Sequence, residues 1–279
     1  MQYAAQMTGP AQIAGHGALI DSGQVAGNGL LRNLRVAVTG GTSGLGLALV
    51  QALSTAGANV AFVARGRERV EEVERLHASS HTAGLAEGQG AVHGVVGDLS
   101  LKQDIHRIAL QMLGRLGGLD VLVNNASDLG PTPLAPLGDT DCEDFERALQ
   151  TNVLGPFRLT KALLGALASS AREGRGALVL NVSSDAAVNA YAGWGAYGAS
   201  KAALAHLSRI WNEELAAQGV HFLALDPGDM DTPLHAIAVP DADRSSLKRP
   251  EDAAAEFIAT MVDLLPPLAP RVELSRRTS

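Results

Sequence analysis

The chain has 279 residues, of which 46% are hydrophobic and 4% aromatic, with 31 glycines, one cysteine and a formal charge of −7. This composition suits one large α/β domain with tight turns, and it argues against an aromatic-rich β-sandwich. The negative charge argues against a nucleic-acid partner, the single cysteine against a disulfide framework or a multi-cysteine metal site, and the lack of a long apolar run against a membrane span.

The first 33 residues differ in composition from the rest of the chain. They are rich in Gly, Ala and Gln, and they keep neither a helical nor a strand period for long. We expect an N-terminal arm over residues 1–33 that is flexible or loosely packed, in which a short hairpin over 18–28 is an alternative. The pattern becomes regular at Leu34, so the sequence predicts one domain over 34–279.

Within that domain, short apolar runs alternate with helical segments. The runs are continuous, which is typical of strands covered on both faces. Strict alternation predicts a parallel sheet with right-handed crossovers. The predicted strands are 35–40, 59–65, 91–98, 119–126, 176–184, 220–228 and, as a seventh, 271–274. The predicted helices are 45–57, 67–79, 101–117, 141–170, 195–219 and 250–265.

A glycine-rich turn, "TGGTSGLG" over residues 39–46, follows the first predicted strand and opens the first helix. Glycines let a backbone approach phosphates, and a helix N-terminus supplies N–H donors and a positive dipole end. The position in a strand–turn–helix unit therefore predicts dinucleotide binding.

The end of the second predicted strand bears on which dinucleotide binds. An acidic residue there would accept from a ribose 2′-hydroxyl and favour NAD, but this chain has Ala64 followed by Arg65. A guanidinium pairs well with a 2′-phosphate, which favours NADP(H) and leaves NAD(H) possible. Arg67 and Arg69 are expected to belong mainly to a solvated face.

Tyr197 and Lys201 are spaced by just over one helical turn, so they share a helix face. That spacing is common by chance, but it is one of seven motifs in a fixed order. They are "TGGTSGLG", "GDL" at 97–99, "NNA" at 124–126, "TNVLGPF" at 151–157, "NVSS" at 181–184, "YGASK" at 197–201 and "DPGDMDT" at 226–232. With these motifs the chain resembles the short-chain dehydrogenase/reductase family, from about Leu34 to its end.

The resemblance implies a single Rossmann-like, doubly wound domain of about seven mostly parallel strands with helices on both faces. It implies four catalytic residues, Asn152, Ser184, Tyr197 and Lys201. It implies a cofactor site made of Thr39, Gly40, Thr42, Ser43, Gly44, Leu45, Gly46, Arg65, Asp98, Leu99, Asn125, Ala126, Tyr197, Lys201, Pro227, Gly228 and Thr232. Two positions depart from the family pattern: Ser127 stands where Gly is usual, and Ser43 where many NADP-using members carry a basic residue.

These residue types suit hydride chemistry. A free tyrosine has a pKa of about 10, so we expect Lys201 and the oxidised nicotinamide to lower the pKa of Tyr197, the acid–base. Ser184 would position the carbonyl oxygen, with Ser183 as its competitor on the opposite strand face. In the family, the residue matched by Asn152 holds a water that links the lysine to solvent. Asp98 and Asn124 also have structural interpretations, as a helix cap and as a tie between strands.

The sequence therefore predicts an NADP(H)-dependent carbonyl reductase or alcohol dehydrogenase acting on a small molecule. One alternative is a non-catalytic dinucleotide sensor on the same scaffold. Another, a sugar-nucleotide epimerase or dehydratase, would need more residues after Gly228. The histidines lack metal-ligand spacing, so we expect no metal. We expect a lid over residues 230–250, a homodimer or homotetramer paired through the helical segments 159–168 and 202–211, and a cytoplasmic protein without a secretion signal.

Overall fold

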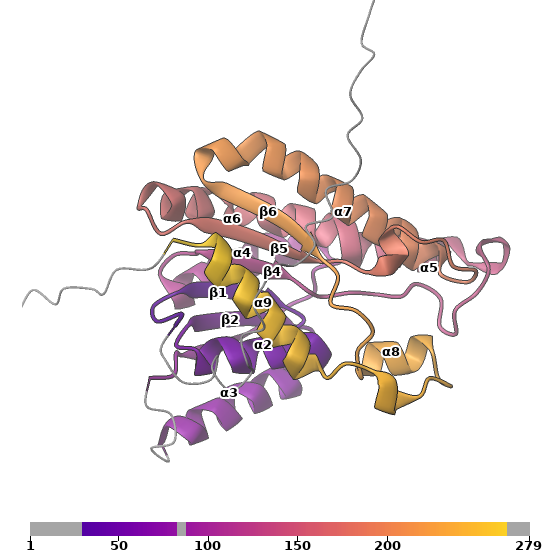
Figure 1. Ribbon diagram of the computed structural model, residues 1–279, viewed down its shortest axis with the longest axis horizontal. Helices are drawn as coiled ribbons and strands as arrows, with labels where there is room; N and C mark the ends of the chain where they lie inside the picture. The colour runs from indigo at the N-terminus through magenta and orange to yellow at the C-terminus, as the bar shows by residue number, and fades with distance from the viewer. Residues whose placement is uncertain (1–29, 83–87, 267–279) are drawn as a thin grey trace, which may run out of the picture.

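The computed structural model describes residues 30–82 and 88–266, and its centre is a six-stranded parallel sheet in the order β3-β2-β1-β4-β5-β6 (Figure 1). The strands are β1 (Arg35–Thr39), β2 (Asn59–Ala64), β3 (Val92–Val96), β4 (Val121–Asn124), β5 (Ala177–Val182) and β6 (Val220–Leu225). This order confirms the predicted doubly wound α/β domain, and the direction of winding reverses between β1 and β4.

The sheet formed by the described residues has six strands, whereas about seven were expected. The predicted seventh strand, at 271–274, lies outside the described residues. So do the hairpin over 18–28 and residues 1–29 of the predicted arm. At the end of that arm, Leu31 is buried and its N–H donates to the carbonyl of Ala56 at 2.9 Å. The division at residue 34 stays a prediction.

Two layers of helices cover the sheet. The helices are α2 (Gly44–Thr55), α3 (Arg67–Thr82), α4 (Ile105–Leu116), α5 (Cys142–Leu149), α6 (Gly155–Arg172), α7 (Gly195–Leu215), α8 (Pro233–Ala238) and α9 (Pro250–Leu264). One layer contains α2, α3 and α9, and the other contains α4, α6 and α7 (Figure 1). Successive side chains of a strand point to opposite faces of the sheet, which explains why each helix layer packs on an apolar face. In β1, Val36 and Val38 belong to the hydrophobic core on one face and Ala37 to the core on the other.

The prediction of one long helix over 141–170 is wrong in one respect. The structure divides it into α5, a π-helical segment η3 (Gln150–Leu154) and α6. The N–H of Gly155 donates to the carbonyl of Gln150, five residues back. The wide turn carries the buried side chain of Asn152, whose hydrogen bonds to other segments hold it in place.

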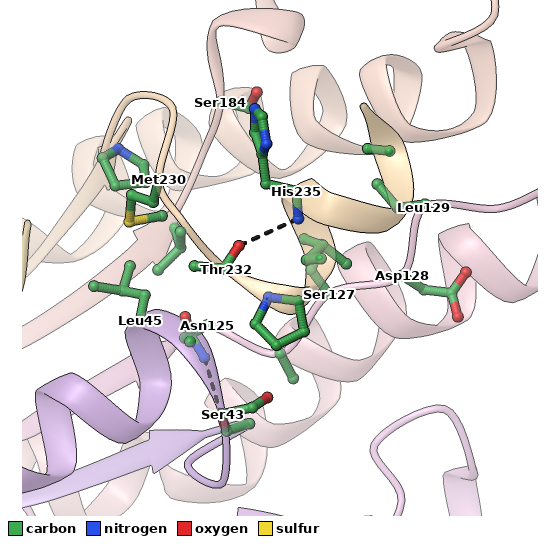
Figure 2. Close-up of a pocket in the computed structure, with 18 of the residues that line it drawn as sticks. Ser43, Leu45, Asn125, Ser127, Asp128, Leu129, Ser184, Met230, Thr232 and His235 are labelled. Carbon is green, nitrogen blue, oxygen red and sulfur yellow. Dashed lines mark hydrogen bonds between the residues drawn. The ribbon is translucent and has the colours of Figure 1, made fainter. Parts of the chain in front are cut away.

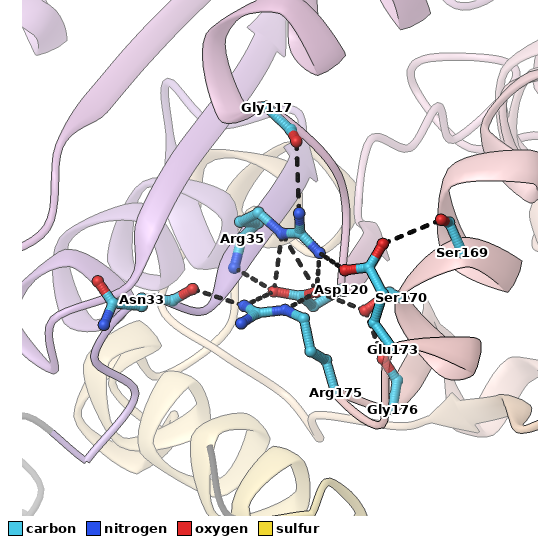
Figure 3. A network of polar contacts seen from close by, with 9 residues as sticks. All are labelled: Asn33, Arg35, Gly117, Asp120, Ser169, Ser170, Glu173, Arg175 and Gly176. Atoms are coloured by element: carbon cyan, nitrogen blue, oxygen red, sulfur yellow. Dashed lines mark hydrogen bonds and ion pairs between the residues drawn. The ribbon is translucent and has the colours of Figure 1, made fainter. Parts of the chain in front are cut away.

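A buried ion network joins the amino ends of three strands, opposite the edge where the glycine turn lies (Figure 3). Asp120, just before β4, is fully buried and accepts from Arg35 of β1 at 2.6 Å and from Arg175, before β5, at 2.6 Å. Ser170 of α6 also donates to it. Burial acts to raise the pKa of Asp120, but the hydrogen bonds from Arg175, Arg35 and Ser170 outweigh it and lower this pKa to about 2.

The segment predicted as a lid folds against the carboxyl edge of the sheet. It contains α8 and a short 3-10 turn, η6 (Arg244–Ser246). The Thr232 side chain caps α8 by accepting from the N–H of His235 at 3.2 Å. Within the described ranges, none of the helices is both long and apolar enough to cross a membrane.

Candidate active site

The glycine turn is shaped by close backbone contacts. Gly40 and Gly44 have φ of +73° and +51°, which favour glycine. A Cβ on Gly46 would lie 2.1 Å from the carbonyl oxygen of Gly40, so no side chain fits there. The Thr39 hydroxyl accepts the N–H groups of Asn125 at 2.9 Å and Ala126 at 3.0 Å, which ties the ends of β1 and β4 together.

The N-terminus of α2 opens from this turn with its backbone N–H groups free of side-chain caps. Ser43 is the N-cap residue but makes no capping hydrogen bond, and the first turn contains no acidic residue. A helix start without these partners has the donors and the positive dipole end that an anion needs. The turn and the helix start together fit the pyrophosphate of a dinucleotide.

One cavity of about 950 Å³ runs along the carboxyl edge of the sheet. It is lined by all of the predicted site residues except Thr39, Gly46 and Asn152. Figure 2 shows side chains from the glycine turn, the end of β4, Ser184 and α8 turned toward this common space. The structure therefore brings the predicted nucleotide turn and three of the four predicted catalytic residues, Ser184, Tyr197 and Lys201, to one cavity.

At one end of the cavity are the residues expected near the adenosine. Arg65 and Arg69 both line the cavity and are exposed, whereas Arg67 pairs with Glu71 at 3.6 Å. Arg69 is thus a solvent-exposed residue and also a second cation at the cavity. The Asp98 carboxylate accepts from the backbone N–H and the hydroxyl of Ser100, at 2.9 and 2.7 Å.

The Tyr197 and Lys201 side chains meet on one face of α7, as their spacing predicts. Both are buried, although both border the cavity. The Lys201 ammonium lies 5.4 Å from the centre of the Tyr197 ring and donates to the carbonyl of Val182 at 2.8 Å. The edge of the Trp194 ring packs against Tyr197, with centroids 5.7 Å apart. The phenol and the ammonium are therefore held in fixed positions beside the end of β5.

Burial raises the pKa of Tyr197 to about 12, since the opposing effect of the Ser184 and Ser127 hydroxyls is smaller. The expected fall in this pKa is therefore wrong for the chain's own residues, because loss of solvation dominates. Burial also lowers the pKa of Lys201 to about 8, against a weaker opposing effect of Asp226. The chain alone thus keeps the phenol protonated at neutral pH.

A family model described as short chain dehydrogenase matches residues 35–242, most of the chain. The chain belongs to the short-chain dehydrogenase/reductase family. It is accordingly an oxidoreductase of that type, and the sensor alternative is not favoured.

Three proteins illustrate the likeness. The chain is 34% identical over 234 residues to the "Rhamnolipids biosynthesis 3-oxoacyl-(acyl-carrier-protein) reductase" of Pseudomonas aeruginosa, covering 80% of this chain and 86% of that one. A short chain dehydrogenase from Burkholderia cenocepacia, solved in complex with NADP, has 25% identity and a TM-score of 0.70, covering 84% and 91%. A 3-ketoacyl-(acyl-carrier-protein) reductase from Brucella melitensis, complexed with NADH, has 26% identity and a TM-score of 0.72, covering 83% and 91%.

In this short-chain dehydrogenase, Asn152 lies behind the cavity rather than on its surface. Its amide nitrogen donates to the carbonyl of Asp128 and to the Ser200 hydroxyl, both at 2.8 Å. Its amide oxygen accepts the N–H of Asp128 at 2.8 Å and the Ser127 hydroxyl at 3.3 Å. The side chain has no hydrogen-bonding capacity left for a water.

Two serine hydroxyls, those of Ser127 and Ser184, lie beside Tyr197. Ser127, at the position where the family usually has Gly, lines the cavity and contacts Asn152. Ser184 follows β5, accepts the N–H of Ala186 at 3.2 Å and donates to the Asp185 carboxylate at 3.2 Å. Ser183 also lines the cavity, and its N–H donates to Leu225 at 2.7 Å. Ser184 rather than Ser183 affects the Tyr197 pKa, which favours Ser184 as the predicted partner.

Of the two structural interpretations of motif residues, the one for Asn124 is right, and the one for Asp98 is wrong because Leu101 and Asp104 are the N-cap residues of the next helical segments. Asn124 donates to the Asn181 amide oxygen at 2.8 Å and thus does tie β4 to β5. Sequence reasoning missed Asp185, Arg69 and Ser200 as site residues. Asp185 directly follows the "NVSS" motif, and this position was the one available signal. No group of three or more side chains that could hold a metal lies in the part of the chain that the structure describes.

Proposed function

We propose that the chain is an NADP(H)-dependent oxidoreductase that interconverts a carbonyl group and an alcohol on a small molecule. The observation that carries the proposal is the single cavity that joins the uncapped start of α2 to Ser184, Tyr197 and Lys201. Solved relatives in complex with NADP and with NADH support a nicotinamide dinucleotide as the cofactor.

The bound nicotinamide would supply or accept the hydride. The chain's own residues would manage the oxygen of the substrate. Ser184 would hydrogen-bond the carbonyl oxygen and fix its position. Tyr197, whose pKa burial raises to about 12, is protonated at neutral pH and would donate its proton as charge develops on that oxygen. The Lys201 ammonium, 5.4 Å from the ring centre, would stabilise the tyrosinate that results.

The preference for NADP(H) rests on the end of β2. Ala64 offers no carboxylate for a ribose 2′-hydroxyl, and the exposed guanidinium of Arg65 is at the cavity. Arg69 adds a second guanidinium at the same end. Two guanidinium groups at the cavity, with Ala64 in the place of an acidic residue, suit a 2′-phosphate better than a free hydroxyl.

Three broader expectations also belong to the proposal. The exposed Phe157 of α6 and Ile210 of α7 support a homodimer or homotetramer that pairs through these helices. The single, unpaired Cys142 fits a reducing compartment such as the cytoplasm. The catalytic domain begins near residue 34, after an N-terminal arm.

The test is turnover of NADPH and NADH with a panel of ketones and aldehydes, for the native protein and for Tyr197→Phe. The variant keeps the ring but loses the hydroxyl, so we expect unchanged NADPH binding by fluorescence and a rate lowered by roughly 10²–10⁴-fold. Binding of NADPH without turnover of any carbonyl would support the sensor instead. Full activity of Tyr197→Phe would refute the acid–base assignment.

A further inference from the structure

The carboxylate of Asp185 lies directly beside the predicted catalytic serine. Asp185 begins a short 3-10 turn, η4 (Asp185–Ala187), immediately after Ser184. One carboxylate oxygen accepts the Ser184 hydroxyl at 3.2 Å, and the other accepts the Tyr191 hydroxyl at 2.6 Å. The Ser184 hydroxyl has a single proton, so when it donates to a substrate oxygen the Tyr191 hydroxyl still orients this carboxylate, and both carboxylate oxygens have lone pairs for a further donor.

Asp185 differs from Asp128 and Asp226, two other carboxylates of the cavity, in lacking a nearby cation. Asp128 pairs with Arg147 at 3.3 Å. Asp226 interacts with the buried ammonium of Lys201. Asp185 has no ion-pair partner among residues 30–82 and 88–266, yet it lines the cavity. Its charge is therefore available to a bound molecule.

The same end of the cavity has an apolar wall. A small cluster brings together Leu129, Ala186 and Tyr197 with Leu134, Trp194, Leu234 and Ala238. This cluster includes the ring of Tyr197, so the wall begins where the reacting oxygen would lie. A substrate at this end would meet apolar surface on one side and an unpaired carboxylate on another.

The distances limit where a charged group of the substrate could lie. A carbonyl oxygen bound to Ser184 at a normal hydrogen-bond length would be within about 6 Å of the Asp185 carboxylate, since the two side chains are 3.2 Å apart. An ammonium on the first or second carbon from the carbonyl carbon spans that gap, with one hydrogen bond to Asp185. A carboxylate in the same place would be repelled.

We propose that this site takes ketones, and the corresponding alcohols, that carry an ammonium group one or two carbons from the reacting carbon and an apolar remainder. The inference rests on the proposed function, because it places the substrate oxygen at Ser184 and Tyr197. Asp185 acts here as a specificity-determining residue, and it takes no part in the proton or hydride transfer.

The experiment compares three phenyl ketones in the native protein with NADPH. They are 2-dimethylamino-1-phenylethanone, whose amine is protonated near neutral pH, its uncharged isostere 3-methyl-1-phenylbutan-1-one, and the anionic 4-oxo-4-phenylbutanoate. We expect kcat/KM for the cationic ketone to exceed that for its isostere by about two- to fivefold, as for a favourable exposed ion pair. The keto acid should be the poorest of the three. High salt should reduce the preference.

Asp185→Asn keeps the shape of the side chain and removes its charge, so it should abolish the preference for the cationic ketone over its isostere, measured as the ratio of the two kcat/KM values in the same variant. The control is Asp263→Asn, on the exposed surface of α9. It changes the net charge by the same amount but lies outside the cavity, so it should retain the preference for the cationic ketone. The native comparison does not depend on how well either variant folds.

Three results would overturn the inference. Turnover of the neutral ketone with no preference for the cation would refute the substrate class and leave the proposed function standing. A preference unchanged in Asp185→Asn would refute the role of this carboxylate, and an equal loss with all three ketones would assign Asp185 a purely structural role. Failure of every carbonyl in the wider panel would refute the proposed function and the inference together.

Discussion

The Asp120 network offers a sharp test of how this fold is held together. Asp120 is fully buried and lies between the guanidinium groups of Arg35 and Arg175 (Figure 3). Asp120→Asn keeps the size of the side chain but leaves both arginines, which are largely buried, without their anion. We expect the substitution to destabilise the protein strongly and to change how its stability depends on pH.

The magnitude follows from the pKa. The ordinary pKa of 3.8 falls to about 2 in the fold, which favours the charged carboxyl by about 2.5 kcal/mol. Removing one member of a buried ion pair costs about 3 to 5 kcal/mol, because the partner charge is left unpaired. Since the folded pKa lies below the unfolded one, this contribution is complete above about pH 4 and is lost as the pH falls toward 2.

The assay is urea unfolding followed by circular dichroism at several pH values between 3 and 7. At pH 7, Asp120→Asn should lower the free energy of unfolding by about 3 kcal/mol or more, whereas Asp263→Asn, on the surface, should change it by less than about 0.5 kcal/mol. The difference between the native protein and Asp120→Asn should narrow below about pH 4. A loss under about 1 kcal/mol at pH 7, or a loss that does not depend on pH, would refute the reasoning.

Three further predictions concern the site. Arg65→Ala should weaken NADPH binding by about tenfold and leave NADH binding nearly unchanged in fluorescence titrations, and an equal effect on both would argue against a 2′-phosphate contact. Gly46→Ala should weaken binding of both dinucleotides by more than tenfold, because its Cβ would lie 2.1 Å from the Gly40 carbonyl, whereas Gly114→Ala, with open space around it, should not. Ser127→Gly should raise the pKa of Tyr197, since the Ser127 hydroxyl lowers it, and so move the pH profile of alcohol oxidation to higher pH; an unmoved profile would show that Ser127 does not act on the phenol.

Much of the fold could be predicted because its signals are local. The continuous apolar runs gave the six observed strands, and strict alternation with helices gave a parallel sheet. The division of the predicted helix 141–170 could not be predicted, since the π-helical turn depends on hydrogen bonds from Asn152 to Ser200 and to Asp128, residues distant in sequence. The Asp120 network was missed for the same reason, because its arginines precede or begin other strands.

The site shows the same division between local and non-local information. The glycine turn and the Tyr197–Lys201 spacing are local patterns, and the structure brings them into one cavity. The pKa of Tyr197 is set by how deeply the fold buries the ring, which spacing alone does not reveal. Asp185 became a candidate only when its lack of an ion-pair partner within the described ranges could be seen.

The π-helical segment η3 has a practical consequence for anyone who edits this chain. A π turn contains one residue more than an α turn, so deleting one residue from Gln150–Leu154 would restore ordinary helix and leave the faces of α5 and α6 nearly in phase, at the cost of the position of Asn152. Deleting a residue early in α6 would instead rotate the rest of that helix by about 100°, so that Leu163 and Leu167, both fully buried against the sheet, would point elsewhere. Grafts and chimeras that join at this helix should therefore change its length in the π turn and not in α6.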